Sequence, residues 1–249
     1  MALRTFLRTL GAGAPSVDTV VTTARVQPGA PLRCEVTVRG GGADLTVERL
    51  RLELVVRAED LEPDGSTSWN NPYVVTEATV DSFRLPAGET VVRRIALDVP
   101  WEMPLTHERG LRLSGSRVAV RTELAVDSAV DKGDFDEIQV HALPSQELLF
   151  QVYQDLGFRF RESEVKLGKE RWPDRMKDRR TAPFWQELDF HFPASWNRGA
   201  QELETVLITR PDALDVHPGG YPPVTLPAGE PDRAVWRQAV EEHIRAYWA

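Results

Sequence analysis

Apolar and polar residues alternate along the first half of the chain, and this period of two is typical of half-buried β-strands. The alternation is clearest at residues 32–38 and 50–56, where leucine, cysteine or valine recurs at every second position and most of the intervening residues are charged. Pro28 and Gly29 precede the first segment and glycines 40–42 follow it, and these residues favour turns. The pattern predicts strands joined by tight turns.

Further strands are predicted downstream in the same half. Residues 74–83, 91–99 and 117–126 are expected to be strands, with a loop at 59–72 and a turn at 86–88. No segment with helical periodicity separates these strands, which favours antiparallel pairing over a parallel sheet. The first half is therefore predicted to be an all-β antiparallel sandwich.

A helical pattern replaces the alternation in the middle of the chain. Residues 146–156 carry apolar side chains at helical spacing, with Ser145 as the expected N-cap and Gly157 as the stop. This linker helix divides the chain into an N-terminal domain, residues 1–143, and a C-terminal domain, residues 144–249.

The C-terminal domain is predicted to contain strands and a terminal helix. Strands are expected at 158–160, 184–192 and 203–209, with a highly charged connection over residues 164–180. The last segment, residues 231–248, places its apolar and aromatic side chains in one stripe with a period of 3.6. We therefore expect a second, smaller β-domain that ends in an amphipathic helix.

Composition bears on the class of partner and on location. The 249-residue chain carries a formal net charge of −8, which argues against nucleic acid because phosphate binding needs a basic surface. The single cysteine, Cys34, cannot form an internal disulfide and falls on the inward side of its strand, so we expect a core residue. No apolar run approaches the roughly 20 residues that cross a bilayer, and the first residues lack a secretory signal. We expect a cytoplasmic protein whose membrane contact is at most peripheral.

No catalytic motif survives a check of its sequence context. Gly11 and Gly13 begin a partial dinucleotide fingerprint, but Ser16 stands where the third glycine is needed. A zinc-protease motif fails because His107 has no second histidine at Leu111. No serine lies in a nucleophile elbow. We therefore predict that the protein is not an enzyme and needs no cofactor.

Two loops are candidates for ligand binding. The first is an acidic loop whose carboxylates suit a hard cation such as calcium, although its spacing is not that of an EF-hand and a solvated loop is the preferred interpretation. Its candidate ligands are Asp127, Asp131, Asp134 and Asp136. The second is the aromatic loop 68–73, where Trp69 is expected either to stack on a sugar or peptide or, preferably, to cover a sheet edge.

Two basic segments are candidates for partner binding. The N-terminus has the pattern of a short cationic amphipathic helix, which suits a membrane, a partner or the sandwich itself. The segment 164–180 is locally basic and suits an acidic partner or a solvated connection. The candidate contact residues are Arg4, Phe6, Leu7, Arg8 and Leu10 in the first segment, and Trp172, Arg175, Arg179 and Arg180 in the second.

Three stretches of the sequence resemble one bacterial family. They read GAGAPSVDTVVTTARVQPGAPLRCEVTVRGG, VAVRTELAVDSAVDKGDFDEIQVHALPSQ and FWQELDFHFP. They are similar to the sporulation-control proteins of the SpoOM type, which look like bacterial arrestins. The resemblance implies an arrestin-like pair of β-sandwiches that acts as a regulatory scaffold, and it brings no catalytic residue with it.

The predicted fold is all-β, with two arrestin-like antiparallel β-sandwiches in tandem, a short N-terminal helix, a linker helix and a C-terminal amphipathic helix. The predicted function is that of a non-enzymatic scaffold or adaptor, which binds protein partners by strand addition at an unpaired edge or by loop docking. The alternative is a ligand- or calcium-binding module that uses the acidic loop 127–136 or the Trp69 loop. Sandwich edges would also allow a homodimer.

Overall fold

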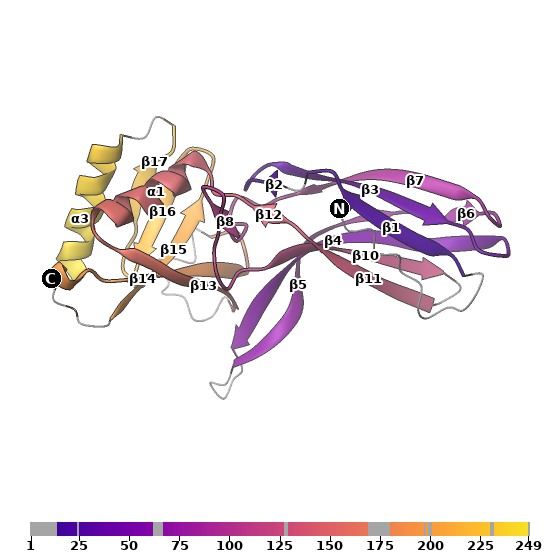
Figure 1. Ribbon diagram of the computed structural model, residues 1–249, viewed down its shortest axis with the longest axis horizontal. Helices are drawn as coiled ribbons and strands as arrows, with labels where there is room; N and C mark the ends of the chain where they lie inside the picture. Colours follow the sequence, from indigo (N-terminus) through magenta and orange to yellow (C-terminus); the bar gives the residue numbers. More distant parts are fainter. Residues whose placement is uncertain are drawn as a thin grey trace.

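The molecule is elongated, and its two halves lie end to end along the longest axis of the computed structural model (Figure 1). The structure describes residues 14–23, 25–61, 67–126, 129–168, 180–196, 198, 201–229 and 232–248. The first half consists of strands, and the second combines strands with helices. The predicted N-terminal helix lies outside the described residues.

The first half is a β-sandwich, as the alternating pattern predicts. One layer is a three-stranded antiparallel sheet in the order β1-β3-β7. The other layer is centred on β4, which pairs with β10 on one side and with β5 and β6 on the other, while β11 pairs with β10. These strands are β1 (Ser16–Val21), β3 (Pro31–Arg39), β4 (Leu45–Leu61), β5 (Thr67–Val80), β6 (Phe83–Leu85), β7 (Thr90–Asp98), β10 (Val118–Val126) and β11 (Ala129–Glu137).

Two short strand pairs lie where the halves meet (Figure 1). The strands β2 (Arg25–Val26) and β12 (Gln139–Val140) are parallel, and β8 (His107–Glu108) and β9 (Leu111–Arg112) form a small antiparallel hairpin. The pair of β2 and β12 brings segments that are far apart in the sequence to the beginning of the second half.

The inward side chains of the two layers form one hydrophobic core. Every second residue in the middle of β3 is buried, and Cys34 is among them, as predicted. Burial, reinforced by the carboxylate of Asp136, raises the pKa of the Cys34 thiol to about 11. A thiol with that pKa is protonated at neutral pH and is a poor nucleophile. Cys34 therefore acts as a small core residue.

The prediction of a loop at residues 59–72 is wrong, because most of this segment is a hairpin. The ladder between β4 and β5 continues as far as Leu61 opposite Thr67, and Trp69 lies within it, opposite Glu59. Trp69 is therefore part of a strand and not of a loop. The alternation that marks a strand reflects burial of one face, and the end of this hairpin stands away from both halves (Figure 1).

The prediction of an acidic loop at residues 127–136 is also wrong. The strand β11 pairs antiparallel with β10, with Asp131 opposite Leu124 and Asp136 opposite Val120. In the described part of the chain β11 is the outermost strand of its layer, and charged residues are common on edge strands because they discourage further pairing. Aspartate and glycine have low strand propensity, so the sequence alone favours a loop here.

The second half is a sheet in which β13 to β17 pair antiparallel in sequence order. The helices α1 and α3 pack on its apolar face and share a second core with it. The bounds are α1 (Pro144–Asp155), β13 (Arg159–Leu167), β14 (Phe184–His191), the 3-10 helix η1 (Ala194–Trp196), β15 (Glu202–Thr209), β16 (Ala213–Pro218), β17 (Val224–Pro227) and α3 (Arg233–Trp248). In the described residues this half is a sheet covered by helices, and the predicted second sandwich is not seen there.

Local chemistry fixes both ends of α1. Pro144 occupies the first helical position, and the backbone N–H of Leu143 donates to the side chain of Gln146 at 2.9 Å. The N-cap is therefore Leu143, and the predicted cap at Ser145 is wrong. Gly157 follows the helix with a φ of 88°, as the predicted stop requires.

The terminal helix α3 buries the predicted stripe against the sheet. Its buried side chains are Trp236, Val240 and Ile244. Asp232 caps the helix, because its carboxylate accepts the backbone N–H of Ala234 at 2.8 Å. Within the described residues, no helix is long and apolar enough to span a membrane.

The strand β4 carries the sheet of the first half into the second. Beyond its pairing with β10, Glu59 of β4 lies opposite Lys166 of β13 in parallel orientation. In the described part of the chain the strands of both halves thus form one ten-stranded sheet. Val165, Leu167 and Phe184 from the second half also pack into the core of the first. Backbone pairing and core packing therefore hold the halves together.

Candidate functional site

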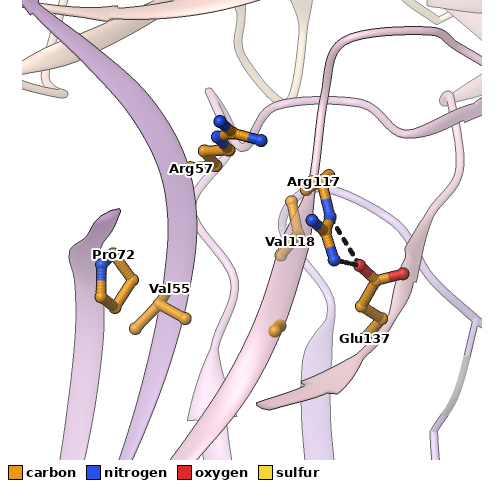
Figure 2. A pocket seen from close by; sticks show the side chains of 7 residues that line it. Val55, Arg57, Pro72, Arg117, Val118 and Glu137 are labelled. Atoms are coloured by element: carbon orange, nitrogen blue, oxygen red, sulfur yellow. Dashed lines mark hydrogen bonds and ion pairs between the residues drawn. The ribbon is translucent and has the colours of Figure 1, made fainter. Parts of the chain in front are cut away.

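A hollow of about 160 Å³ lies on the sheet at the base of the β4–β5 hairpin (Figure 2). Four adjacent strands surround it, and it combines apolar side chains with two guanidinium groups and one carboxylate. The lining residues are Pro72 of β5, Val55 and Arg57 of β4, Arg117 with Val118 and Ala119 at the start of β10, and Glu137 at the end of β11.

A β-bulge creates this hollow. Val56 lies opposite Tyr73 and Ala58 lies opposite Asn70, so one β4 residue faces two β5 residues, one of which is Pro72. Bulges bend a strand and redirect the side chains beside them, and they accept proline because the local ladder is already interrupted. On the other side of β4, Val56 lies opposite Val118, and the backbone N–H of Arg57 donates to the carbonyl of Arg117 at 3.1 Å. The pairing of β4 with β10 therefore places the two arginines side by side.

Arg117 and Glu137 form an ion pair at the rim of the hollow (Figure 2). The Nε of Arg117 donates to Oε1 of Glu137 at 2.6 Å, and a second guanidinium nitrogen contacts the same oxygen. Nη1 of Arg112 lies 4.0 Å from the other oxygen. The side chains of Arg117 and Glu137 are 54% and 43% exposed, and pairs this exposed contribute about 0.2–1 kcal/mol to stability. Another carboxylate could replace Glu137 at little cost.

A second hollow of about 230 Å³ lies on the other side of this ion pair. It shares Arg117, Val118 and Glu137 with the first hollow, and its further lining residues are Thr106, His107, Arg112, Ser116, Ile138 and Gln139. Among the residues that the structure describes, three arginines and one glutamate line the two hollows. This is a local excess of positive charge on a chain whose formal net charge is −8.

Two stacked histidines border the second hollow. The rings of His107 and His141 lie 5.1 Å apart at 18°, and Thr106 and Gln139 hydrogen-bond to them at 2.9 and 3.0 Å. Partial burial lowers the pKa of both rings, and nearby arginines add to this effect. Both rings are therefore neutral at neutral pH, and the positive charge of the hollows comes from their arginines.

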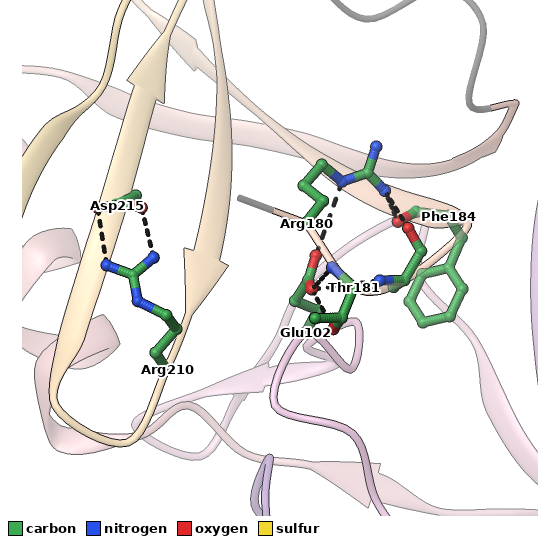
Figure 3. Close-up of polar contacts among 7 residues, drawn as sticks. Glu102, Arg180, Thr181, Phe184, Arg210 and Asp215 are labelled. Atoms are coloured by element: carbon green, nitrogen blue, oxygen red, sulfur yellow. Dashed lines mark hydrogen bonds and ion pairs between the residues drawn. The ribbon is translucent and has the colours of Figure 1, made fainter. Parts of the chain in front are cut away.

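The hollows lie next to a polar junction that fixes the second half (Figure 3). The carboxylate of Glu102, from the loop after β7, accepts the backbone N–H and the hydroxyl of Thr181, each at 2.7 Å. The side-chain amide of Gln186 on β14 pairs with both backbone groups of Leu105 at 2.8 Å. It also contacts the hydroxyl of Ser116, again at 2.8 Å. Ser116 lines the second hollow, so the junction and the hollow form one structure.

Comparisons of the sequence and of the structure with known proteins all point to one family. The model of the SpoOM protein family matches residues 3–217. The chain belongs to the SpoOM family. The sporulation-control protein spo0M of Bacillus subtilis strain 168 is 28% identical over 208 residues, which cover 83% of this chain and 75% of that protein. The crystal structure of Spo0M, sporulation control protein, from Bacillus subtilis matches with a TM-score of 0.73 and 23% identity, covering 95% of this chain and 100% of that one. This match supports an arrestin-like β-sandwich, and it does not confirm the tandem pair that the resemblance implies.

Most of the partner-binding candidates in this SpoOM-family chain lie outside the described residues, and their roles stay predictions. They are Arg4, Phe6, Leu7, Arg8, Leu10, Trp172, Arg175 and Arg179. The same holds for Asp127 and for the side chains of Asp131 and Asp134. Among the described side chains, no group of three or more histidines, cysteines, aspartates or glutamates is placed to hold a metal ion.

Arg180 is the partner-binding candidate whose side chain the structure describes, and it points into the protein. Its side chain is 5% exposed, its Nε lies 3.6 Å from Glu102, and its guanidinium stacks on Trp185 at 5.2 Å (Figure 3). Burial lowers its pKa and Glu102 counteracts this effect. Arg180 is thus part of the junction between the halves, and it presents almost no surface to a partner.

The outer face of the second sheet carries an acidic cluster that the sequence analysis does not predict. Glu164, Glu187, Asp189 and Glu204 lie on neighbouring strands, with Lys166 bonded to Glu187 at 2.5 Å. Asp189 is 8% exposed, and its pKa is raised to about 7 by burial and then by the surrounding glutamates. Part of the signal is present in the sequence, because Glu187 and Asp189 alternate with apolar residues in the predicted strand 184–192.

Proposed function

We propose that this SpoOM-family protein is a non-enzymatic regulator of the cytoplasm that acts by binding protein partners. Membership of a family that includes a sporulation-control protein supports a regulatory role. Polar groups next to the hollows, such as Gln186 and Glu102, bind backbone groups of the junction and thereby have a structural role. This arrangement favours recognition over catalysis.

The observation that carries the proposal is the free edge of β5. In the described residues β5 pairs with β4 alone, so its other side presents backbone N–H and C=O groups without a strand partner. Such an edge can accept an extended peptide as an added strand. Pro72 lies at one register shift and Val75 at a second, because Val55 lies opposite Val74 but Leu54 lies opposite Thr76, so the continuous stretch available for pairing is 76–80. Glu77 and Thr79 in this stretch are exposed.

Two proline variants, Thr76→Pro and Glu77→Pro, test this proposal. Consecutive residues of a strand point their N–H groups to opposite sides, so one variant removes a bond to β4 and the other removes a donor on the free edge. Thermal unfolding identifies the first variant by its lower melting temperature. We expect the variant that stays stable to lose the partner that the wild type captures from its own lysate. Retention of that partner would contradict strand addition at β5.

A second copy of the chain is one occupant that the free edge would accept. We expect sedimentation velocity to show a monomer at low micromolar concentration if the edge is reserved for another protein. A dimer that the edge variant abolishes would instead identify the partner as this chain itself.

A further inference from the structure

The two hollows beside Arg117 have the charge and the size to hold acidic side chains of a polypeptide. Their described lining includes three arginines and one glutamate, which favours an anionic ligand. Their volumes of about 160 and 230 Å³ are below the roughly 300 Å³ of a typical small-molecule site, so each suits one side chain rather than a metabolite.

Glu137 already shows how a carboxylate binds there. One of its oxygens accepts two contacts from Arg117, and the other faces Arg112 at 4.0 Å. Hydrogen bonds between a guanidinium and a carboxylate are charge-assisted and are stronger than those between neutral groups. Because Glu137 is the last residue of β11 and its side chain is partly exposed, it can rotate into solvent while the backbone pairing of β11 stays intact.

We propose that these hollows bind an acidic segment of a protein partner, and that a carboxylate of this segment displaces Glu137 from Arg117. Glu137 then acts as an internal competitor that occupies the arginine when the partner is absent. The inference rests on the proposed function and adds the chemistry of the partner. Pro72 of β5 lines the first hollow and residues 76–80 of the same strand are available for pairing, so one partner segment can reach both.

The test uses the full chain and a short fluorescein-labelled peptide in which valine and glutamate alternate, with binding followed by fluorescence anisotropy. We expect the peptide to bind, and matched peptides with glutamine or lysine in place of glutamate to bind much more weakly. Salt at about 0.5 M should weaken the interaction because it screens exposed charges.

Two variants distinguish a specific site from a general charge effect. Arg117→Gln should lower the affinity about tenfold, since it removes a charge-assisted hydrogen bond. Glu137→Gln should raise the affinity severalfold, because the competitor is lost. A misfolded variant cannot produce this gain. Arg94→Gln is the control, because Arg94 is exposed on the opposite layer and pairs with Glu35 at 3.2 Å, and it should leave the affinity unchanged.

The inference is overturned if the glutamate peptide fails to bind, if Arg117→Gln binds it as well as the wild type does, or if Glu137→Gln weakens binding. The proline variants test strand addition at β5 independently of this inference. If partner capture depends on the free edge of β5 but Arg117→Gln does not change the affinity for the peptide, then strand addition is supported and the acidic ligand is rejected. If the proline variant at the free edge still captures the partner, strand addition itself is rejected.

Discussion

Asp189 shows how a single side chain can make the stability of this protein depend on pH. It is almost fully buried on the outer face of the second sheet, and its pKa of about 7 lies well above the value of about 4 for an unfolded chain. The folded state therefore binds the proton more tightly than the unfolded state does. The stability of the folded state therefore falls as the pH rises from about 4 through about 7. The raised pKa of nearby Glu204 acts in the same direction.

Replacing Asp189 by asparagine should remove this penalty. We expect Asp189→Asn to unfold at a higher temperature than the wild type at pH 8, with a gain that shrinks as the pH is lowered towards 4. Melting temperatures measured across this range test the prediction. Asp212→Asn is the control, because Asp212 is exposed, and its effect should not vary in this way. A gain for Asp189→Asn that is the same at every pH would contradict the assignment.

At the scale of elements, the sequence predicts strands and helices where burial is one-sided. The strand β3 and the helix α3 are predicted closely because each buries one face against the core. The strand β16 is not predicted, since its buried Asp215 and His217 break the usual pattern of apolar residues facing inward. The far end of the β4–β5 hairpin escapes prediction because it stands away from the sandwich (Figure 1).

The candidate site is less predictable than the fold. Arg57 and Arg117 are far apart in the sequence and meet through the register of β4 with β10, while a bulge between β4 and β5 brings Pro72 to the same hollow. Register shifts depend on how two strands fit together, and one strand's sequence does not encode them. Arg57 belongs to the alternating pattern of its strand, but nothing in that pattern links it to Arg117.

The turn between β9 and β10 depends on a glycine at a contact between the halves. Gly115 has a φ of 92°, and a Cβ there would lie 1.8 Å from the carbonyl oxygen of Ser163 on β13. We expect Gly115→Ala to lower the free energy of unfolding by about 3 kcal/mol, because it adds backbone strain and forces β13 to move. Urea denaturation measures this change.

The matched control is Gly88→Ala. Gly88 also has a positive φ, of 70°, but no atom lies within 4 Å of the position that a Cβ would take there. Its cost should be about 1 kcal/mol or less, since strain is the whole effect and the loss of chain entropy in the unfolded state offsets part of it. Equal losses for both glycines would show that the contact with Ser163 does not matter.

At the scale of the whole molecule, a continuous sheet and the contacts between the two halves connect them. We call these contacts the seam. The pairing of β4 with β13, the packing of Phe184 in the first core and the bonds of Gln186 all cross this seam. A continuous structure of this kind predicts a single cooperative unfolding transition. It also holds the free edge of β5 and the hollows in a fixed relation to the second half.

Removing the side chain of Gln186 should loosen the seam. Gln186→Ala leaves both backbone groups of Leu105 and the hydroxyl of Ser116 without this partner, so we expect a loss of about 2 kcal/mol. Differential scanning calorimetry should show one transition for the wild type and a lower or divided transition for the variant. Gln238→Ala on the exposed side of α3 should change stability by less than about 0.5 kcal/mol. A wild type that already unfolds in two separate steps would contradict a shared seam.

Hydrogen–deuterium exchange of the full chain, with and without its captured partner, tests the central claim most directly. Strand addition beside the hollows predicts that the partner slows exchange in residues 76–80 and at 117–119, because free backbone donors become bonded and the hollow is covered. Protection confined to other parts of the chain, with the exchange of β5 unchanged, would contradict the account.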